Sequence, residues 1–171
     1  MQYELTTPCT AADLAPLKAG DTVLLSGVVY TARDQAHKRM LEALDKGEKL
    51  PFDLEGSAIY YVGPTTSGRM DAMSPRLLDL GNKIMIGKGK RDAAVKEAVV
   101  RNGAVYLAAL GGAGALMAQS VKTLEVIAWP DLGCEAVRRL TVEKMPLTVI
   151  LDAHGGDLYT SGPAAYLETV K

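Results

Sequence analysis

The sequence predicts an α/β fold in which residues 1–171 form a single domain around a sheet that is at least partly parallel. Short apolar runs rich in β-branched residues alternate with amphipathic helical stretches, the pattern of strands connected by helices. A length of 171 residues suits one domain with its own buried core. The first third of the chain holds two long strand-like runs and a single helix, so we expect extra β structure on one side.

The first strand and the first helix are predicted by neighbouring signals. Residues 22–31 are rich in β-branched side chains, which is typical of a strand. Asp34 stands where an N-cap belongs, and apolar residues then recur at helical spacing until Gly47, which predicts a helix over that stretch. Residues 57–62 predict a second strand, and it ends in the turn-rich segment 63–71.

Further elements follow in the same alternation. The Ser74-Pro75 pair is an N-cap with proline at the first helical position, and Gly81 is placed to end this short helix. Residues 83–86 predict a third strand, and residues 92–101 an amphipathic helix with Gly103 behind it. The remaining expected elements are a strand at 104–110, a glycine-led helix at 111–122, a strand at 124–129, a helix at 135–140 and a strand at 147–151.

Charge and cysteine content exclude several classes of protein. With 19 basic and 20 acidic residues the formal net charge is −1, which removes the electrostatic argument for a nucleic-acid binder. Cys9 and Cys134 are the two cysteines, so this chain alone cannot hold a four-cysteine zinc site or an all-cysteine iron–sulfur cluster. The N-terminus lacks the pattern of a secretory signal, and no apolar stretch is long enough to span a bilayer. We therefore expect a cytoplasmic protein without a membrane partner.

Candidate functional residues lie in four loops that follow predicted strands. In α/β sheets the loops at the carboxyl ends of strands gather around the ligand, so we expect these four to converge. Arginine binds carboxylates in a bidentate manner, and glycine lets backbone amides approach an oxyanion. Together the loops therefore favour binding of a small anion. They are Thr31-Ala-Arg33-Asp34, Thr65-Thr66-Ser67-Gly68-Arg69, Gly87-Lys88-Gly89-Lys90 and Gly111-Gly112-Ala113-Gly114.

Structural roles are the alternatives for the same residues. Arg33 and Asp34 suit a surface ion pair, Arg69 suits a tie within its own loop, and the two lysines suit solvated turns. Packing, or a hydrogen bond to a neighbouring loop, is the simpler role for His37. The chain lacks a GxxxxGK[ST] loop and a complete GxGxxG motif, and its histidines and carboxylates do not show metal-ligand spacing. The residues alone thus describe half an active site, with anion-binding groups but no evident base, metal or cofactor.

The motifs nevertheless resemble those of a known family. The segments run from Leu5-Thr-Thr-Pro8 nearly to the C-terminus, in the expected order, and they are similar to the β subunit of class I fumarases. That family is the iron–sulfur hydro-lyase group that also includes L(+)-tartrate dehydratase. The main segments are Tyr30-Thr-Ala-Arg-Asp-Gln-Ala-His-Lys-Arg39, Gly63-Pro-Thr-Thr-Ser-Gly-Arg-Met-Asp71, Ile86-Gly-Lys-Gly89, Ala104-Val-Tyr-Leu-Ala-Ala-Leu-Gly-Gly-Ala113, Asp131-Leu-Gly-Cys-Glu-Ala-Val-Arg-Arg139, Val142-Glu-Lys-Met-Pro146 and Asp152-Ala-His-Gly155.

The resemblance implies a fold, a cofactor and a partner. The fold is a three-layer β/β/α "swivelling" domain. A separate α subunit supplies three cysteines to a 4Fe–4S cluster, whose open iron binds the substrate's hydroxyl and a carboxylate, so this chain is expected to bind no metal itself. The β part closes over the dicarboxylate, and the implied assembly is a homodimer or an α2β2 complex. The division accounts for a chain with few cysteines and many anion-binding loops.

Individual roles also follow from the resemblance. Arg33 and Arg69 match the two carboxylate-binding arginines, Lys88 matches the substrate-binding lysine, and Thr65 matches the threonine that takes part in proton transfer. One departure is that Tyr61-Val-Gly-Pro64 runs straight into Thr65, where relatives have a longer loop with a second Gly-Pro. Supporting positions around these side chains are Asp34, His37, Thr66, Gly87 and Gly89.

The function expected on this basis is that of a β subunit of a class I fumarate hydratase. Together with its α partner it would hydrate fumarate reversibly to L-malate, and alone it would be inactive. The alternatives are the β subunit of L(+)-tartrate dehydratase or of a hydro-lyase for a related dicarboxylate such as mesaconate. A small-anion-binding module without catalysis is the alternative from another class.

Overall fold

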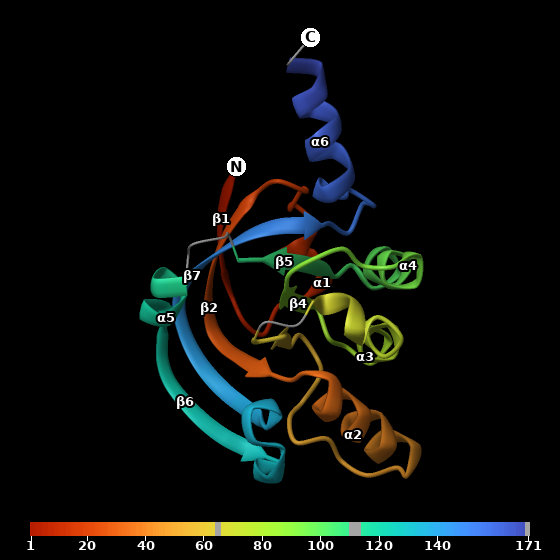
Figure 1. Ribbon diagram of the computed structural model, residues 1–171, viewed down its shortest axis with the longest axis vertical. Helices are drawn as coiled ribbons and strands as arrows, with labels where there is room; N and C mark the ends of the chain where they lie inside the picture. Colours follow the sequence, from red (N-terminus) through yellow and green to blue (C-terminus); the bar gives the residue numbers. More distant parts are fainter. Residues whose placement is uncertain (64–65, 110–113, 170–171) are drawn as a thin grey trace.

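The computed structural model describes residues 1–63, 66–109 and 114–169, which form seven strands and six α-helices (Figure 1). The strands are β1 (Gln2–Thr6), β2 (Thr22–Thr31), β3 (Ala58–Tyr60), β4 (Ile84–Gly87), β5 (Val105–Ala108), β6 (Val121–Ala128) and β7 (Val137–Leu151). The helices are α1 (Ala11–Leu14), α2 (Asp34–Asp45), α3 (Ser74–Asp79), α4 (Ala93–Asn102), α5 (Gly114–Ser120) and α6 (Leu158–Thr169). Two short 3₁₀ helices span Ser67–Met70 and Pro130–Glu135.

The sheet closes on itself through five of its strands. Its order is β1-β2-β3-β4-β5-β7-β6, and an additional pairing between β2 and β7 joins the two sides into a barrel-like ring. The β1–β2, β2–β3, β3–β4 and β4–β5 pairs are parallel, whereas β7 runs antiparallel to β2, β5 and β6. The predicted α/β class with a partly parallel sheet is therefore confirmed, and the sequence pattern does not predict the closure through β7.

Two hydrophobic cores lie on the two faces of this sheet, because alternate residues of a strand point to opposite faces. The barrel core gathers side chains of the closed strands and includes Val29, Ala58, Ile84, Ile86, Val105, Leu107, Leu140 and Val149. The helix-facing core includes Ala36, Met40, Ile59, Leu77, Met85, Val95, Val99 and Tyr106. Strands β3, β4 and β5 contribute to both cores, which explains why their sequences read as continuous apolar runs.

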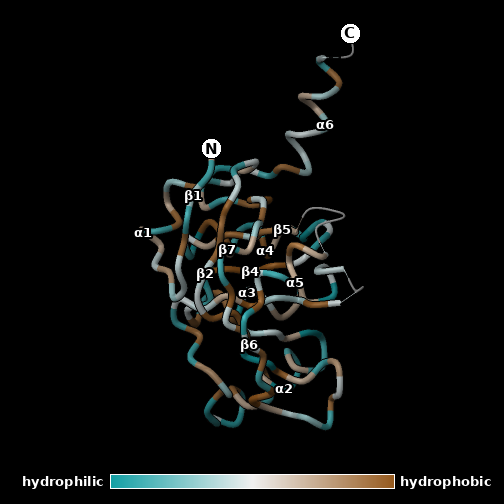
Figure 2. Tube along the Cα trace, turned by 90° about the vertical axis from the view of Figure 1, so that its left-hand side faces the viewer, coloured by the Kyte–Doolittle hydropathy of each residue, from teal (hydrophilic) through white to brown (hydrophobic). Residues whose placement is uncertain are grey.

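Helices α2, α3 and α4 stack along one side of the sheet, while α5 lies on the other side beside β6 and β7 (Figure 1). The caps of α4 agree with the sequence, since the Asp92 side chain accepts a hydrogen bond from the amide of Val95 at 2.9 Å, and Gly103 is left-handed at φ 58°. Helix α6 projects away from the rest of the described chain in both views (Figures 1 and 2).

Several predicted boundaries are wrong, and one element has the wrong type. In place of the helix expected at 135–140, Glu135 ends the second 3₁₀ helix and residues 137–140 begin β7, because pairing with β2 and β6 determines this segment and register shifts interrupt the strand alternation. Asp34 and Ser74 are the first residues of α2 and α3 rather than N-caps; Arg33 and Met73 hold the cap positions. The Ser74 hydroxyl instead donates to the carbonyl of Met70 at 2.9 Å.

Gly27 offers a test of the contact between β2 and the end of β1. Its φ is +100°, and a Cβ there would lie 2.6 Å from Thr7 Oγ1 and 2.9 Å from the Thr7 carbonyl oxygen. Backbone strain and overpacking together should lower the free energy of unfolding of Gly27→Ala, measured with urea, by about 2–4 kcal/mol. Gly47→Ala is the matched control, because Gly47 has φ +70° with nothing within 4 Å, and strain alone should cost it about 1 kcal/mol. Equal losses in the two variants would contradict this packing argument.

Candidate functional site

Three of the predicted loops converge where β2, β3 and β4 end. Gly63, in the loop after β3, lies between Arg33 and Lys88: a Cβ on Gly63 would be 2.9 Å from Arg33 Nη1. The Lys88 ammonium donates to the Gly63 carbonyl at 3.0 Å. Gly63 has φ +114°, in the region that favours glycine, so the chain can make this close approach to Arg33. The arrangement brings two cations from different strands to one glycine.

Arg69 belongs to the same group through the start of α2. Its Nε lies 2.8 Å from Asp34 Oδ2 in an ion pair, and the arginine is largely exposed while Asp34 is mostly buried. The ion pair is therefore formed between two loops and not between the adjacent Arg33 and Asp34. Arg33 has its own acidic neighbour, with 3.9 Å from its Nε to Glu135 Oε1. The exposed guanidinium of Arg69 keeps further N–H groups for a ligand.

His37 supports this group from within the fold. It is fully buried, and its Nδ1 lies 2.8 Å from the Arg33 carbonyl, which can only accept, so Nδ1 carries the proton. Burial lowers the pKa of His37 to about 4, and the nearby Arg91 charge lowers it too. The ring packs edge-on against Tyr61, with 5.3 Å between centroids. His37 thus has the packing and hydrogen-bonding role that its sequence position favours.

A buried ion pair beneath the loops joins the segments that carry Arg69 and Lys88. Arg91 Nε donates to Asp71 Oδ1 at 2.5 Å, and the Arg91 side chain is completely buried. The other oxygen of Asp71 accepts from the amide of Asp92 at 2.7 Å. The Arg91 guanidinium also lies over the rings of Tyr61 and Tyr106, at 5.3 and 4.9 Å from their centroids. The pair connects the 3₁₀ turn after β3 to the loop after β4.

Ser67 makes a second connection between the same two loops. Its hydroxyl accepts from the Lys88 amide at 2.9 Å, and its own amide donates to the Lys88 carbonyl at 2.9 Å. A Cβ on Gly87 would fall 2.0 Å from Ser67 Oγ, so this close contact requires glycine there. Gly89 has φ +86° and lies beside Thr66, whose Cβ would be 3.6 Å from a Cβ on Gly89.

The structure therefore brings Arg33, Asp34, Thr66, Arg69, Gly87, Lys88 and Gly89 to one end of the sheet, with His37 underneath. Thr65 and the segment 111–113 lie outside the described residues. Asp71, Arg91 and Tyr106 are supporting residues that the sequence does not single out, whereas Ser67 lies within a predicted loop but was given no role of its own. Arg91 follows a glycine–lysine turn, so in the sequence it resembles a solvated charge. The feature that could have pointed to the buried ion pair is Asp71, in the Gly-Arg-Met-Asp motif.

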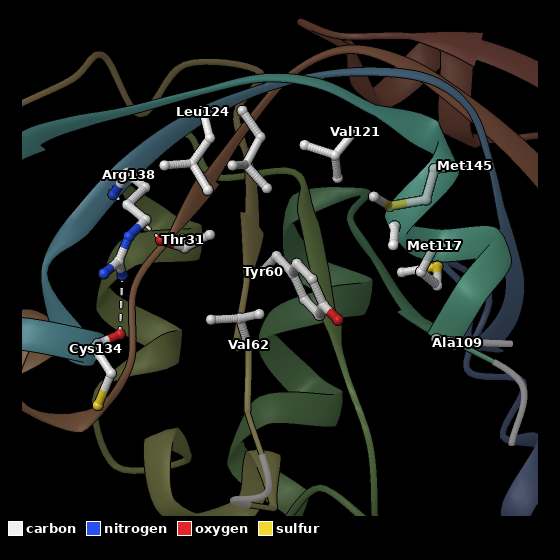
Figure 3. Close-up of a pocket in the computed structure, with 13 residues that line it drawn as sticks. Thr31, Tyr60, Val62, Ala109, Met117, Val121, Leu124, Cys134, Arg138 and Met145 are labelled. Atoms are coloured by element: carbon white, nitrogen blue, oxygen red, sulfur yellow. Dashed lines mark hydrogen bonds between the residues drawn. The ribbon is translucent and has the colours of Figure 1, made fainter. Parts of the chain in front are cut away.

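An apolar pocket lies beside these loops (Figure 3). It has a volume of about 520 Å³ and is covered by α5, β6 and β7, with Tyr60 and Val62 on the opposite side. Arg138 lies at its edge and donates to the Cys134 carbonyl at 3.0 Å. Thr31 and Gly114, from two of the predicted loops, line the pocket, whereas Arg33, Arg69 and Lys88 do not, so the pocket adjoins the cationic loops.

Neither a set of metal ligands nor a membrane-spanning helix occurs in the described part of the chain. No group of three or more His, Cys, Asp and Glu side chains among them could hold a metal ion. Cys9 is a buried free thiol whose pKa is raised to about 11 by burial and by the Asp13 charge, and Cys134 is exposed. The residues present therefore do not fit an iron–sulfur cluster on this chain. No helix of the described part combines the length and apolar character needed to cross a bilayer.

Fold and site together define an α/β protein whose cations gather at the carboxyl ends of parallel strands. The family model described as "Fumarase C-terminus" matches residues 1–162. The chain belongs to this family, which joins class I fumarate hydratases and tartrate dehydratase beta subunits.

Relatives in the family have two chain organisations. A Methanocaldococcus jannaschii protein with the provisional name L(+)-tartrate dehydratase subunit beta is 41% identical over 170 residues, covering 88% of this chain and 87% of that protein. The Escherichia coli L(+)-tartrate dehydratase subunit beta is 30% identical over 187 residues, covering 98% and 92%. The aerobic class I fumarate hydratase of Escherichia coli is 35% identical over 164 residues, which cover 86% of this chain but 30% of that enzyme.

The buried pair of Arg91 and Asp71 should matter far more for stability than an exposed pair. Arg91→Leu leaves Asp71 without its partner, and the loss of a buried partner typically costs about 3–5 kcal/mol. Arg101→Leu is the control, because Arg101 and Asp79 form an exposed pair at 2.9 Å whose loss should cost below about 1 kcal/mol. Urea unfolding of the two variants measures the difference, and equal costs would refute the importance assigned to the pair.

His37 should make stability depend on pH. Its pKa is about 4 in the folded chain and 6.5 without burial, so the unfolded state binds more protons between these values. The contribution of neutral, buried His37 to the free energy of unfolding is complete above pH 6.5 and is lost as pH falls toward 4. The loss between pH 7 and pH 5 should be about 2 kcal/mol in urea unfolding. His37→Gln should remove this part of the pH dependence and His154→Gln should keep it; the opposite pattern would reject the assignment.

Proposed function

We propose that this chain is the β subunit of an iron–sulfur hydro-lyase that hydrates fumarate reversibly to L-malate, and that it supplies the residues that bind the substrate's carboxylates. The observation that carries the proposal is the convergence of Arg33, Arg69 and Lys88 from the ends of β2, β3 and β4. The names of its relatives, tartrate dehydratase subunits and class I fumarate hydratases, agree with this chemistry.

Each cation has a chemical task in the proposed reaction. Fumarate and malate carry two carboxylates, and guanidinium groups bind carboxylates in a fixed, bidentate geometry. Removal of a proton from the carbon beside a carboxylate moves negative charge onto that carboxylate. Arg33, Arg69 and Lys88 would stabilise this charge, because fixed cations act most strongly where charge develops. Thr65 is proposed to take part in the proton transfer, with Asp34 and His37 holding the arginines in place.

The proposal includes an α partner that binds the 4Fe–4S cluster, because the described residues of this chain offer no group to hold one. Two relatives are named as beta subunits, which implies a second subunit in those proteins. In the one-chain fumarate hydratase the matching region is 30% of the enzyme, so the remainder would correspond to the partner. A homodimer of this chain or an α2β2 complex is the proposed assembly.

L(+)-tartrate is the second candidate substrate. The relative that is 41% identical and similar in length is named for tartrate dehydratase, whereas the fumarate hydratases are 35–36% identical. Tartrate is also a dicarboxylate that loses water, so the same three cations would serve it. Mesaconate is fumarate with an added methyl group, so turnover of mesaconate would show whether the site accommodates that group.

We also propose that residues 1–171 act as one domain with the three-layer β/β/α swivelling arrangement. The two walls of the barrel-like sheet around the barrel core would be the β layers, and α2, α3 and α4 would be the third layer. The support for this is the separation of the barrel core from the helix-facing core.

Co-purification of the chain with its α partner under anaerobic conditions tests the proposal. The complex should hydrate fumarate, and side-by-side assays with tartrate and mesaconate rank the substrates. The chain alone should show no turnover. Hydration of fumarate by the isolated chain would exclude the two-subunit site, and a complex inactive on all three substrates would favour a small-anion-binding module.

Arg69→Ala in that complex should lower kcat/KM by at least about 100-fold, because a fixed cation at a developing charge contributes on this scale. Arg76→Ala is the matched control: Arg76 is an exposed arginine paired with Asp45 at 2.6 Å on the outer surface, and its loss should change kcat/KM less than about twofold. Unchanged turnover in Arg69→Ala would remove Arg69 from the proposed site.

A further inference from the structure

The loop that carries Lys88 is held by hydrogen bonds at every backbone polar group of residues 88 and 89. The Lys88 amide donates to Ser67 Oγ at 2.9 Å, and the Lys88 carbonyl accepts from the Ser67 amide at 2.9 Å. The Gly89 amide donates to the Tyr159 hydroxyl at 3.3 Å, and the Gly89 carbonyl lies 3.1 Å from the Tyr106 hydroxyl. An exposed loop rarely has all of these groups bonded to other elements, so this one is strongly constrained.

The hydroxyls of Ser67 and Tyr106 form a hydrogen-bonded chain beneath the loop. The Tyr106 hydroxyl donates to Ser67 Oγ at 2.9 Å and also lies within donating distance of the Gly89 carbonyl oxygen, at 3.1 Å. Ser67 Oγ accepts from the Lys88 amide as well as from Tyr106. The two hydroxyls therefore connect the Lys88 amide to the Gly89 carbonyl.

Burial keeps this hydrogen-bonded chain of hydroxyls intact. Ser67 and Tyr106 are both completely buried, and burial raises the pKa of the Tyr106 phenol, so it stays protonated. The Tyr106 ring is itself held by the Arg91 guanidinium, 4.9 Å from its centroid. Ser67 Oγ packs directly against the Gly87 backbone, because a Cβ at Gly87 would lie 2.0 Å from it. The ammonium of Lys88 meanwhile remains exposed and reaches Gly63.

We propose that Ser67 and Tyr106 are positioning residues that fix the Lys88 ammonium relative to Arg33 and Arg69 for the hydro-lyase reaction. This rests on the proposed function. Neither hydroxyl needs to contact the substrate: they act by fixing the backbone of residues 88 and 89. A rigid site requires no reorganisation when charge develops, and small misplacement of a binding group lowers the rate strongly.

Tyr106→Phe and Ser67→Ala test the proposal in the complex with the α partner. Each variant should lower kcat/KM by about 10- to 100-fold, because each removes a hydroxyl from the hydrogen-bonded chain that holds the Lys88 loop. The double variant should lose no more than the more damaged single variant, since the two hydroxyls act as one unit. Additive losses, or wild-type kcat/KM in Tyr106→Phe, would overturn the proposal.

Two control variants remove similar hydrogen bonds elsewhere. Ser26 Oγ accepts from the Lys144 amide at 3.0 Å, as Ser67 does from Lys88, and Tyr3 donates to the Pro16 carbonyl at 3.3 Å. Ser26→Ala and Tyr3→Phe should keep kcat/KM within about twofold, as surface changes usually do. A loss of kcat/KM in the controls as large as in the test variants would show a general structural effect and overturn the proposal.

Amide hydrogen exchange supplies a readout that does not depend on turnover. In the same complexes, the amides of Lys88 and Gly89 should exchange at least about tenfold faster in Ser67→Ala and Tyr106→Phe than in the wild type or the controls. Unchanged exchange would overturn the positioning role even if activity falls. If the wild-type complex shows no hydro-lyase activity, the proposed function fails, while the exchange result still decides whether these hydroxyls fix the loop. If Tyr106→Phe does not assemble, Ser67→Ala decides alone by the same two measurements.

Discussion

The buried ion pair of Arg91 and Asp71 is the interaction on which the arrangement of the site loops depends. Asp71 ends the turn that carries Arg69, and Arg91 follows the loop that carries Lys88. Because water does not reach the Arg91 side chain, movement of either loop would leave a buried charge without its partner. The Arg91–Asp71 pair therefore fixes the positions of the two exposed cations, Arg69 and Lys88, relative to each other.

The loops thus have a rigid lower side and an exposed upper side. On the lower side, His37, Ser67 and Arg91 are buried. His37 bonds to a backbone carbonyl, Ser67 accepts from a backbone amide, and Arg91 pairs with Asp71. Above, Arg69 and Lys88 stay exposed. Binding groups presented by a well-packed support lose little conformational freedom when they meet a ligand, which is the physical advantage of preorganisation. The same division suits a surface that is completed by a second chain.

The sequence predicts best where the signal is local. Helix α4 carries its own cap at Asp92 and its own terminating glycine at Gly103, so its limits were nearly correct. The convergence of the loops followed from a general property of parallel strands. The helix expected at 135–140 is wrong because residues 137–140 are strand, held by pairing with β2 and β6, and the alternation is broken by register shifts. Arg91 could not be identified as buried, since only the tertiary fold supplies its carboxylate and its two tyrosine rings.

The pairing of β2 with β7 has a consequence for how the chain folds. Thr22 pairs with Thr148 and Thr31 with Arg138, so the ring of strands joins segments from opposite ends of the chain. During synthesis, β2 through β5 emerge as an open parallel sheet with exposed edges until β7 is available. Non-local pairings of this kind slow folding and leave strand edges open to other chains. Closure of the ring is thus a late event that protects both edges at once, and chains ending before β7 are expected to aggregate.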